Sequence, residues 1–356
     1  MFNPDTLKKV IKFISSLKDY SLVYHKDSDG VCSAALISKI LNKPKIVSPN
    51  DQPGVRVSEE LIGRVNEFPN AIFTDLPVDQ ISYEKITSKT LIIDHHIPKR
   101  NLNEILPGRF IHVNPRFTKP DAYLPASYLV YKILERVDKN IRKYSWIAGI
   151  GVVGDRGSDS CRDLMDNVEE DYPELVIKDK YNPKKMWDSE LGFFSKLIES
   201  SKGVKGINGI IKSYEIFSNA ELPEDVKNTE LIEYYHKFQK ELDKLITDFR
   251  YHSEFFSGTN AYIYRIESRY NVESALSTTL SEKDPDAAIF VYRISHDGLH
   301  MSARCQTGRI NVAEILKKLS EGIGSGGGHP QAAAASIKKG FKDRFLERIR
   351  NFLEGI

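Results

Sequence analysis

The stretch "SLVYHKDSDGVCSAAL", residues 21–36, joins a short apolar run to a polar loop and then to a helix-like segment. Ser21–Tyr24 has the composition of a strand, and Val31–Leu41 has that of a helix. The loop between them carries three candidate metal ligands, which are His25, Asp27 and Asp29. A strand, a loop and a helix in this order form the first half of a βαβ unit, so the stretch favours a parallel sheet.

The polar loop alone allows two other interpretations. A calcium-binding EF-hand also has acidic residues at alternate positions followed by glycine, but a bidentate glutamate closes its loop. The twelfth position counted from His25 is Leu36, which excludes that loop. A polar turn whose aspartate caps the following helix stays open. The choice depends on the rest of the chain.

The first half of the chain alternates short β-rich runs with helix-like stretches. The strand candidates are Ser21–Tyr24, Lys45–Val47, Ala71–Thr74, Thr90–Ile93 and Phe110–Val113. The helix candidates that accompany them are Val31–Leu41, Ser58–Val65 and Ala126–Val137. This alternation predicts an α/β domain with a mostly parallel sheet that is covered on both faces.

The middle of the chain has helical patterns. Residues 169–218 contain helix-like pieces around Leu191–Ser200 and Ile207–Tyr214. A longer polar stretch opens at Pro223 and ends near Phe256. Its apolar residues recur at spacings of three and four, namely Leu231, Tyr235, Phe238, Leu242, Leu245 and Phe249. We interpret this stretch as a helical linker packed on its own chain, with a coiled-coil seam as the alternative.

From Ala261 onward an α/β pattern restarts. "AYIYRI", "AAIFVYRI" and "LHMSARC" are typical of strands, and "INVAEILKKL" is typical of a helix. The chain ends in the amphipathic pattern "FKDRFLERIRNFLEGI", which places Phe345, Ile349 and Phe352 on one face. We therefore expect a first domain over residues 1–218, a helical linker over 219–257 and a smaller α/β domain over 258–356.

The composition narrows the classes of function. A chain of 356 residues is long enough for two domains. Its 51 basic residues nearly balance its 49 acidic ones, so contact with nucleic acid would need a local basic surface. The cysteines, Cys32, Cys161 and Cys305, fit neither a disulfide framework nor a zinc site and indicate a reducing compartment. No apolar run has the length of a signal peptide or a membrane span, so we expect a cytoplasmic protein.

Further acidic residues and histidines follow other apolar runs. Asp75 follows "AIFT", Asp94-His95-His96 follows "TLII", and Asp155 lies in "GVVGDRG". In an open parallel sheet, ligands bind outside the carboxyl ends of the strands, so these side chains are expected to converge. Carboxylates and imidazoles without a thiolate suit Mn²⁺ or Mg²⁺. The number of ligands suits two ions about 3.5–4 Å apart, an arrangement that hydrolyses phosphoesters.

Each of these motifs also has a purely structural interpretation. "DHH" after a strand can be a polar turn with surface histidines, Asp75 can begin a loop, and Asp155 can cap a turn. The joint occurrence of all the motifs, each after an apolar run, favours the metal site.

Taken together, the motifs resemble the DHH phosphoesterase superfamily. This superfamily includes RecJ-type exonucleases, oligoribonucleases that also act on pAp, and cyclic-dinucleotide phosphodiesterases. The ordered parts that carry the resemblance are "HKDSDG", the aspartate of "FTDLP", "IIDHHIP" and "GVVGDRG". A further part, "GSGGGHPQAAAAS", resembles the glycine-rich signature of the DHH-associated substrate-binding domain, DHHA1. The resemblance thus covers residues 25 to 336, nearly the whole chain.

The resemblance implies a role for each motif residue. One ion would be held by His25, Asp27 and Asp75. The other would be held by Asp29, Asp75, His95 and Asp155, with Asp75 bridging the two ions. As catalytic residues, His96 would face the scissile phosphate and Asp94 would orient the histidines. His25 departs from the family pattern, because RecJ-like members often have an acidic residue at its place.

The glycine-rich segment "GSGGGHP", residues 324–330, is a candidate substrate site. Successive glycine N–H groups can form an anion-binding nest, whereas a flexible hinge is the structural alternative. The segment lacks the lysine of a Walker A loop, which disfavours nucleoside-triphosphate binding. The resemblance implies that the substrate-binding residues are Arg304, Gly326, Gly327, Gly328 and His329.

Three functions are compatible with these features. We expect a metal-dependent, single-strand-specific exonuclease that uses Mn²⁺, or Mg²⁺ as the alternative. A phosphodiesterase for short oligoribonucleotides, pAp or cyclic dinucleotides is the second candidate. A non-catalytic replication-fork scaffold is the third, and competent residues at every expected ligand position disfavour it. Length and layout are most similar to archaeal Hef-associated nucleases, which implies 3′→5′ polarity, a repair helicase-nuclease as partner and a homotrimer.

Overall fold

The computed structural model describes residues 3–355, which form two compact units. The first unit extends to Tyr235, and the second begins at His236. Each unit is built around its own β-sheet. The boundary falls inside helix α12 (Glu230–His252), which lies within the stretch expected to be a helical linker. The finer division into residues 1–218, 219–257 and 258–356 stays a prediction.

The sheet of the first unit is parallel throughout. Its strands are β1 (Tyr20–Tyr24), β2 (Ile46–Pro49), β3 (Asn70–Thr74), β4 (Lys89–Ile93) and β5 (Phe110–Val113). The spatial order is β2-β1-β3-β4-β5, and every neighbouring pair runs parallel. All the strands expected in the first half of the sequence are therefore confirmed. The strand order reverses between β1 and β3, the place where open α/β sheets bind ligands.

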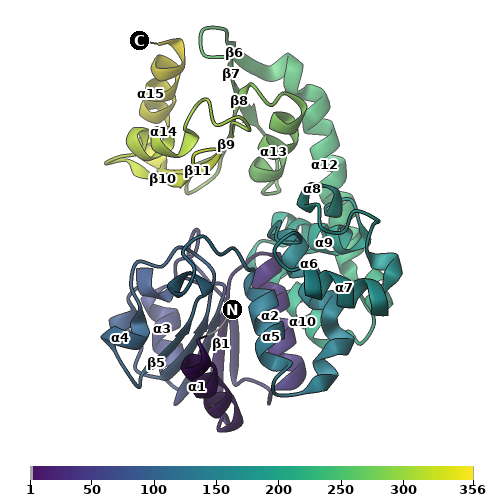
Figure 1. Cartoon of the computed structure of the whole chain (residues 1–356). Coiled ribbons are helices and arrows are strands. Elements are labelled where there is room, and N and C mark those ends of the chain that lie inside the picture. The colour runs from purple at the N-terminus through teal and green to yellow at the C-terminus, as the bar shows by residue number, and fades with distance from the viewer. Residues whose placement is uncertain (1–2, 356) are drawn as a thin grey trace. The chain divides into compact units, whose positions relative to one another are not determined.

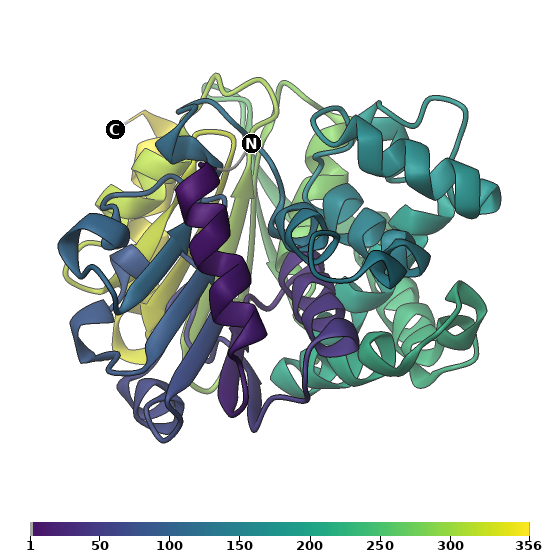
Figure 2. The ribbon, with the colours of Figure 1, turned by 60° about the horizontal axis from the view of Figure 1, so that its bottom comes forward.

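Helices cover both faces of this sheet, as the sequence predicts (Figure 1). Side chains alternate along a strand, so Leu22 and Val23 of β1 belong to different apolar clusters. The Leu22 cluster includes residues from α1 (Pro4–Ser15), α2 (Ser28–Ile40) and α5 (Ala126–Leu134). The Val23 cluster includes residues from α3 (Glu59–Val65) and α4 (Leu102–Ile105). Figure 2 shows α1 running along the strands.

A helical layer extends the larger cluster. It consists of α6 (Ser145–Gly154), α7 (Arg162–Asp171), α8 (Pro183–Met186), α9 (Glu190–Lys205), α10 (Ile207–Asn219) and α11 (Pro223–Lys227). Trp146 of α6 is fully buried, and its ring centroid lies 6.0 Å from that of Phe194 and 6.1 Å from that of Phe217. These aromatic contacts join α6, α9 and α10. Within residues 3–355, no helix combines the length and the apolar character that a membrane span requires.

The sheet of the second unit is mixed. Its strands are β6 (Ser253–Phe256), β7 (Ala261–Ile266), β8 (Ala288–Ile294), β9 (Gly298–Arg304), β10 (Gly324–His329) and β11 (Ala332–Lys338). The order is β10-β11-β9-β8-β7-β6, in which β7 and β8 pair in parallel and the other pairs are antiparallel. Its helices are α13 (Glu273–Lys283), α14 (Val312–Leu319) and α15 (Lys342–Glu354). The second α/β pattern is thus confirmed.

The glycine-rich segment forms an edge strand and not a flexible hinge, and its role in binding an anion stays a prediction. Gly324–His329 forms β10, which pairs along its length with β11. A side chain at Gly326 would place its Cβ 2.4 Å from the carbonyl oxygen of Leu316 in α14. A side chain at Gly328 would meet the carbonyl oxygen of Ala332 at the same distance. The glycines therefore allow the backbones of β10, α14 and β11 to pack closely.

One face residue of the last helix was assigned wrongly from the sequence. Phe345 and Ile349 of α15 are fully buried, as expected, but Phe352 is 41% exposed. Leu346 and Leu353 complete the buried face instead. The buried stripe thus follows the neighbouring leucines, because the helix turns about 100° per residue and Phe352 lies at the edge of that stripe.

Gly326→Ala is expected to destabilise the second unit, because the new methyl group would meet the backbone of α14. Overpacking of this kind costs about 1–3 kcal/mol of unfolding free energy. Gly340→Ala is the matched control, since a Cβ there meets nothing within 4 Å. Urea denaturation of both variants measures the difference. Equal midpoints for the two variants would contradict the packing role of Gly326.

Candidate metal centre

The candidate ligands follow neighbouring strands in one row. The register pairs Tyr24 with Thr74 and Thr74 with Ile93, so β1, β3 and β4 end level with one another. The backbone ladder continues one residue further, since Asp75 N donates to Ile93 O at 2.9 Å and Asp94 N donates to Val113 O at 3.0 Å. Main-chain hydrogen bonds therefore fix the backbone of Asp75 and Asp94, and with it the place of their side chains.

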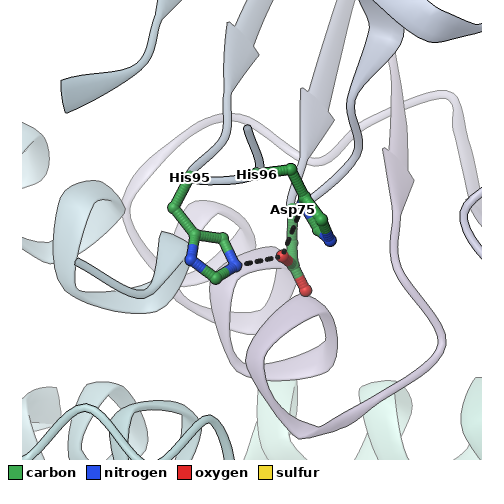
Figure 3. Close-up of side chains that lie close together, drawn as sticks. All are labelled: Asp75, His95 and His96. Carbon is green, nitrogen blue, oxygen red and sulfur yellow. Dashed lines mark ion pairs between the residues drawn. The ribbon is translucent and has the colours of Figure 1, made fainter. Parts of the chain in front are cut away.

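Asp75 lies at the centre of the site (Figure 3). Its backbone has φ of 59°, in the left-handed region that Asp and Asn tolerate better than most side chains. Its Oδ1 lies 3.2 Å from Nε2 of His95 and 3.8 Å from Nδ1 of His96. Its Oδ2 lies 3.3 Å from Nδ1 of His25. The two oxygens of one carboxylate thus face different histidines, as a bridging ligand requires.

The first loop contributes His25 and Asp27 on one side of Asp75. Nδ1 of His25 lies 2.6 Å from Oδ2 of Asp27, and His25, Asp27 and Asp75 form one group with ligand atoms within 4.8 Å of one another. Asp27 also caps α2, because its side chain accepts a hydrogen bond from Gly30 N. The capping interpretation of this loop is therefore correct, and it is compatible with a place in the site.

Asp29, His95 and Asp155 form a second group on the other side of Asp75. Nε2 of His95 lies 3.4 Å from Oδ2 of Asp155. Asp155 follows helix α6, so the apolar run that precedes it is helical and does not continue the row of strand ends. Asp29 is buried, and its two oxygens accept hydrogen bonds from Ala126 N at 2.6 Å and Ser127 N at 2.9 Å. Asp29 therefore also fixes the start of α5.

Asp94 orients the side chain of His96 through a hydrogen bond. Its Oδ1 lies 2.7 Å from Nδ1 of His96, and the carboxyl group is fully buried. Burial alone would raise the pKa of Asp94, but the hydrogen bond from His96 holds it at about 2. Asn114 donates to Asp94 Oδ2 at 3.5 Å and to the carbonyl oxygen of His96 at 2.9 Å. A charged Asp94 thus fixes which nitrogen of His96 carries a proton.

The charge of the cluster fits a divalent cation. Burial, with Asp75 and Asp155 nearby, raises the pKa of Asp29 well above its ordinary value. Burial also raises the pKa of Asp155 to about 6, against the lowering effect of His95. Oδ1 of Asp75 is buried and accepts no hydrogen bond among the described residues. A bound cation would relieve this repulsion and give that oxygen a partner, and the carboxylate and imidazole ligands suit Mn²⁺ or Mg²⁺.

Three further side chains at the site were not among the residues expected from the sequence. Besides Asn114, they are Arg116, which donates from Nε to the carbonyl oxygen of His95 at 2.9 Å, and Tyr123, which donates to Asp155 Oδ2 at 2.7 Å. All three lie between β5 and α5, in a segment that has no family motif. The "NPR" that directly follows β5 is the feature that could have indicated the first two, because it occupies the next strand end in the row.

The expected substrate residues belong to the second unit. Arg304, at the end of β9, donates to the hydroxyl oxygens of Thr278 at 3.1 Å, Ser302 at 3.1 Å and Ser274 at 3.0 Å. These hydroxyls hold the guanidinium group without neutralising it, and no carboxylate within residues 3–355 forms an ion pair with it. Gly326, Gly327, Gly328 and His329 lie on the edge strand β10. Neighbouring strand β11 separates β10 from β9.

Comparison with known proteins supports this description. Residues 260–355 match the model of the DHHA1 domain. No curated protein sequence matches the chain. Among solved structures, a DHH domain described as a member of a family of ribosomal proteins has a TM-score of 0.73 at 15% identity, covering 99% of this chain and 91% of that one.

Two other solved structures come from proteins with a named activity or ion. RecJ from Thermus thermophilus, in complex with Mn²⁺, has a TM-score of 0.72 at 14% identity over 99% of this chain. The match covers 54% of RecJ, so this chain spans about half the length of that protein. A pGpG-specific phosphodiesterase from Vibrio cholerae has a TM-score of 0.51 at 14% identity, covering 94% of this chain and 99% of that one. Residues 260–355 thus match the DHHA1 domain, and the whole chain shares its fold with these proteins.

Proposed function

We propose that this chain is a metal-dependent exonuclease that hydrolyses phosphodiester bonds of single-stranded DNA, with RNA as the alternative substrate, and with 3′→5′ polarity. The observation that carries the proposal is that Asp75 belongs to two groups of candidate ligands outside the carboxyl ends of the strands, one with His25 and Asp27 and the other with His95 and His96. His25, Asp27 and Asp75 would hold one ion, and Asp29, Asp75, His95 and Asp155 would hold the other. Mn²⁺ is the ion that we expect, with Mg²⁺ as the alternative, and RecJ, which has the same fold, binds both.

A pair of divalent ions supplies an activated water and stabilises charge on the reacting phosphate. The chain's own residues orient and hold protons around that chemistry. Asp94 accepts a hydrogen bond from Nδ1–H of His96, which leaves Nε2 of His96 to meet the phosphate. His96 is partly exposed whereas Asp94 is buried, so the histidine can touch substrate while the aspartate positions it. His96 is therefore the proposed catalytic residue, and Asp94 is a positioning residue.

A second candidate function is the hydrolysis of short oligoribonucleotides, pAp or cyclic dinucleotides. It is favoured by the shared fold of the pGpG-specific phosphodiesterase, whose whole length corresponds to nearly all of this chain. The metal centre suits both functions, because both break a phosphodiester bond. The difference lies in how long a strand the protein accepts.

The deciding experiment is a time course with end-labelled single strands of DNA and RNA, run beside dinucleotides and pAp. Progressive shortening of long strands from the 3′ end would support the exonuclease. Turnover confined to dinucleotides or pAp would select the second candidate. No turnover of any substrate with Mn²⁺ or Mg²⁺ present would refute both.

The resemblance also suggests where the protein works. We propose a cytoplasmic protein of DNA repair or replication that forms a homotrimer and associates with a Hef-like helicase-nuclease. Light scattering of the purified chain measures the subunit number, and a monomer would contradict the trimer.

Substitutions in the two units are expected to separate substrate binding from metal binding. Arg304→Ala removes a charged donor, which costs about 1.5–3 kcal/mol and lowers kcat/KM about ten- to a hundred-fold. Metal binding should stay intact in this variant. Asp155→Ala should lose metal and turnover but still bind single strands. Calorimetry with Mn²⁺ and anisotropy of a labelled strand, both on each variant, give the comparison. Loss of metal in Arg304→Ala, or unchanged strand binding and kcat/KM, would refute this division.

A further inference from the structure

The segment between β5 and α5, residues 114–125, contacts the DHH motif and Asp155. We name it the post-β5 segment. It is one continuous piece of chain, and none of its residues belongs to the ligand groups described above. Its contacts therefore raise the question of what it does for the site.

Its first part grips the backbone of the DHH motif. The side-chain amide of Asn114 donates to the carbonyl oxygen of His96, and Nε of Arg116 donates to that of His95. The Nη1 of Arg116 donates to the carbonyl oxygen of Pro120 at 2.8 Å. One guanidinium group thus ties the DHH motif to the middle of the post-β5 segment. The contact fixes the place from which the segment continues toward Tyr123.

Its last part reaches Asp155. The hydroxyl of Tyr123 lies 2.7 Å from Oδ2 of Asp155 and 2.8 Å from the carbonyl oxygen of the same residue. Its ring meets the ring of His95 edge-on, with 5.2 Å between centroids. Tyr123 therefore touches both Asp155 and His95, which belong to the same ligand group.

Asp155 needs such support because of where it lies. It follows the last residue of α6, outside the row of strand ends, and its Oδ2 lies 3.4 Å from Nε2 of His95 and 2.7 Å from the hydroxyl of Tyr123. These neighbours therefore orient its carboxylate. A carboxylate oxygen has two lone pairs and can accept from Tyr123 while it binds a cation. Residues that hydrogen-bond a metal ligand orient it and increase its affinity for the ion.

We propose that Tyr123 is a positioning residue for the divalent cation held by Asp29, His95 and Asp155, fixing the carboxylate of Asp155 and the ring of His95 together. The inference rests on the proposed metal-dependent function. Arg116 supports the position of Tyr123 indirectly, because it links the post-β5 segment to the backbone of the DHH motif. The cation is identified by its chemistry alone, as a hard divalent ion such as Mn²⁺.

Tyr123→Phe tests the inference, because it keeps the ring against His95 and removes the hydroxyl. Tyr128→Phe is the matched control: its hydroxyl donates to Asp163 Oδ1 at 2.8 Å, and Asp163 is in none of the ligand groups. Calorimetric titration of metal-free full-length protein with Mn²⁺ is the primary measurement. We expect Tyr123→Phe to weaken binding of one ion about ten- to a hundred-fold, and Tyr128→Phe to leave both ions unchanged.

Activity gives a second, independent readout. If Tyr123 orients a metal ligand, the activity that Tyr123→Phe loses at low Mn²⁺ should return at saturating Mn²⁺. A merely structural role would lower thermal stability without a change in Mn²⁺ affinity, and that result would overturn the inference. Equal Mn²⁺ affinities of wild type and Tyr123→Phe would overturn it as well.

The same data separate the inference from the proposed function. A wild-type protein that binds Mn²⁺ but cleaves no phosphodiester would refute the proposed function, and the loss of affinity in Tyr123→Phe would still support the role of Tyr123. A wild-type protein that cleaves strands while both variants match it would refute the role of Tyr123 alone. If the wild-type protein bound no Mn²⁺, both the proposed function and the role of Tyr123 would be refuted.

Discussion

Removal of divalent metal is expected to abolish strand cleavage, and Mn²⁺ or Mg²⁺ should restore it whereas Ca²⁺ should not. The reason is the ligand set of carboxylates and imidazoles around Asp75, which without a cation leaves buried carboxylates facing one another. Ca²⁺ prefers more oxygen ligands in a looser geometry and is a poorer Lewis acid for phosphoester hydrolysis.

The measurement uses protein treated with chelator and then dialysed, assayed on an end-labelled strand after each metal is added back. Circular dichroism before and after treatment is the control, since it shows whether the fold survives metal removal. Full activity in excess chelator would refute the metal centre. Equal restoration by Ca²⁺ would mean that the ions serve structure and not chemistry.

Asp75→Asn is expected to lower kcat more than about a hundred-fold, beyond the usual effect of residues that only support a ligand. Asp75 faces His25 with one oxygen and His95 and His96 with the other, so its charge serves both ligand groups. Asparagine has the same shape and also tolerates the left-handed backbone found there, so the variant should fold.

His25→Ala is the comparison variant, and it should lose less, about ten-fold, because His25 belongs to one ligand group alone. The measurement is kcat for both variants across a titration of Mn²⁺. Mild and equal losses would show that Asp75 does not bridge two ions. A larger loss in His25→Ala would shift the centre of the site to the first loop.

The row of strand ends could be predicted from the sequence, because the length and composition of an apolar run indicate a buried strand. Strands such as "TLII" are short apolar runs bounded by polar residues, and the residue after each run is then an end residue of a parallel sheet. Placement of Asp75 and Asp94 needed nothing more. Asp155 was predicted by the same reasoning, but the apolar run before it is a buried helix and not a strand. Short apolar runs do not distinguish a buried strand from a buried helix.

Contacts between distant parts of the chain could not be predicted from the sequence. Gly326 packs against the backbone of α14, which only the folded unit brings near, and the role of these glycines in binding substrate stays a prediction. Tyr123 reaches Asp155 across 32 positions, and nothing in "DAYLPAS" marks that tyrosine as different from others. Patterns along the chain identify elements and their ends, whereas side chains that support a site from another element leave no periodic signal.

Main-chain hydrogen bonds between the strands fix the backbone positions of His25, Asp75 and Asp94. Apolar side chains inside the strands can therefore be exchanged for others of similar volume without displacing these residues. A change of length inside a strand is different, since a shift of one residue turns every following side chain to the opposite face. This chain and RecJ share a fold at 14% identity. Substitution can thus erase most of the likeness between two such sequences while the arrangement of the strands persists.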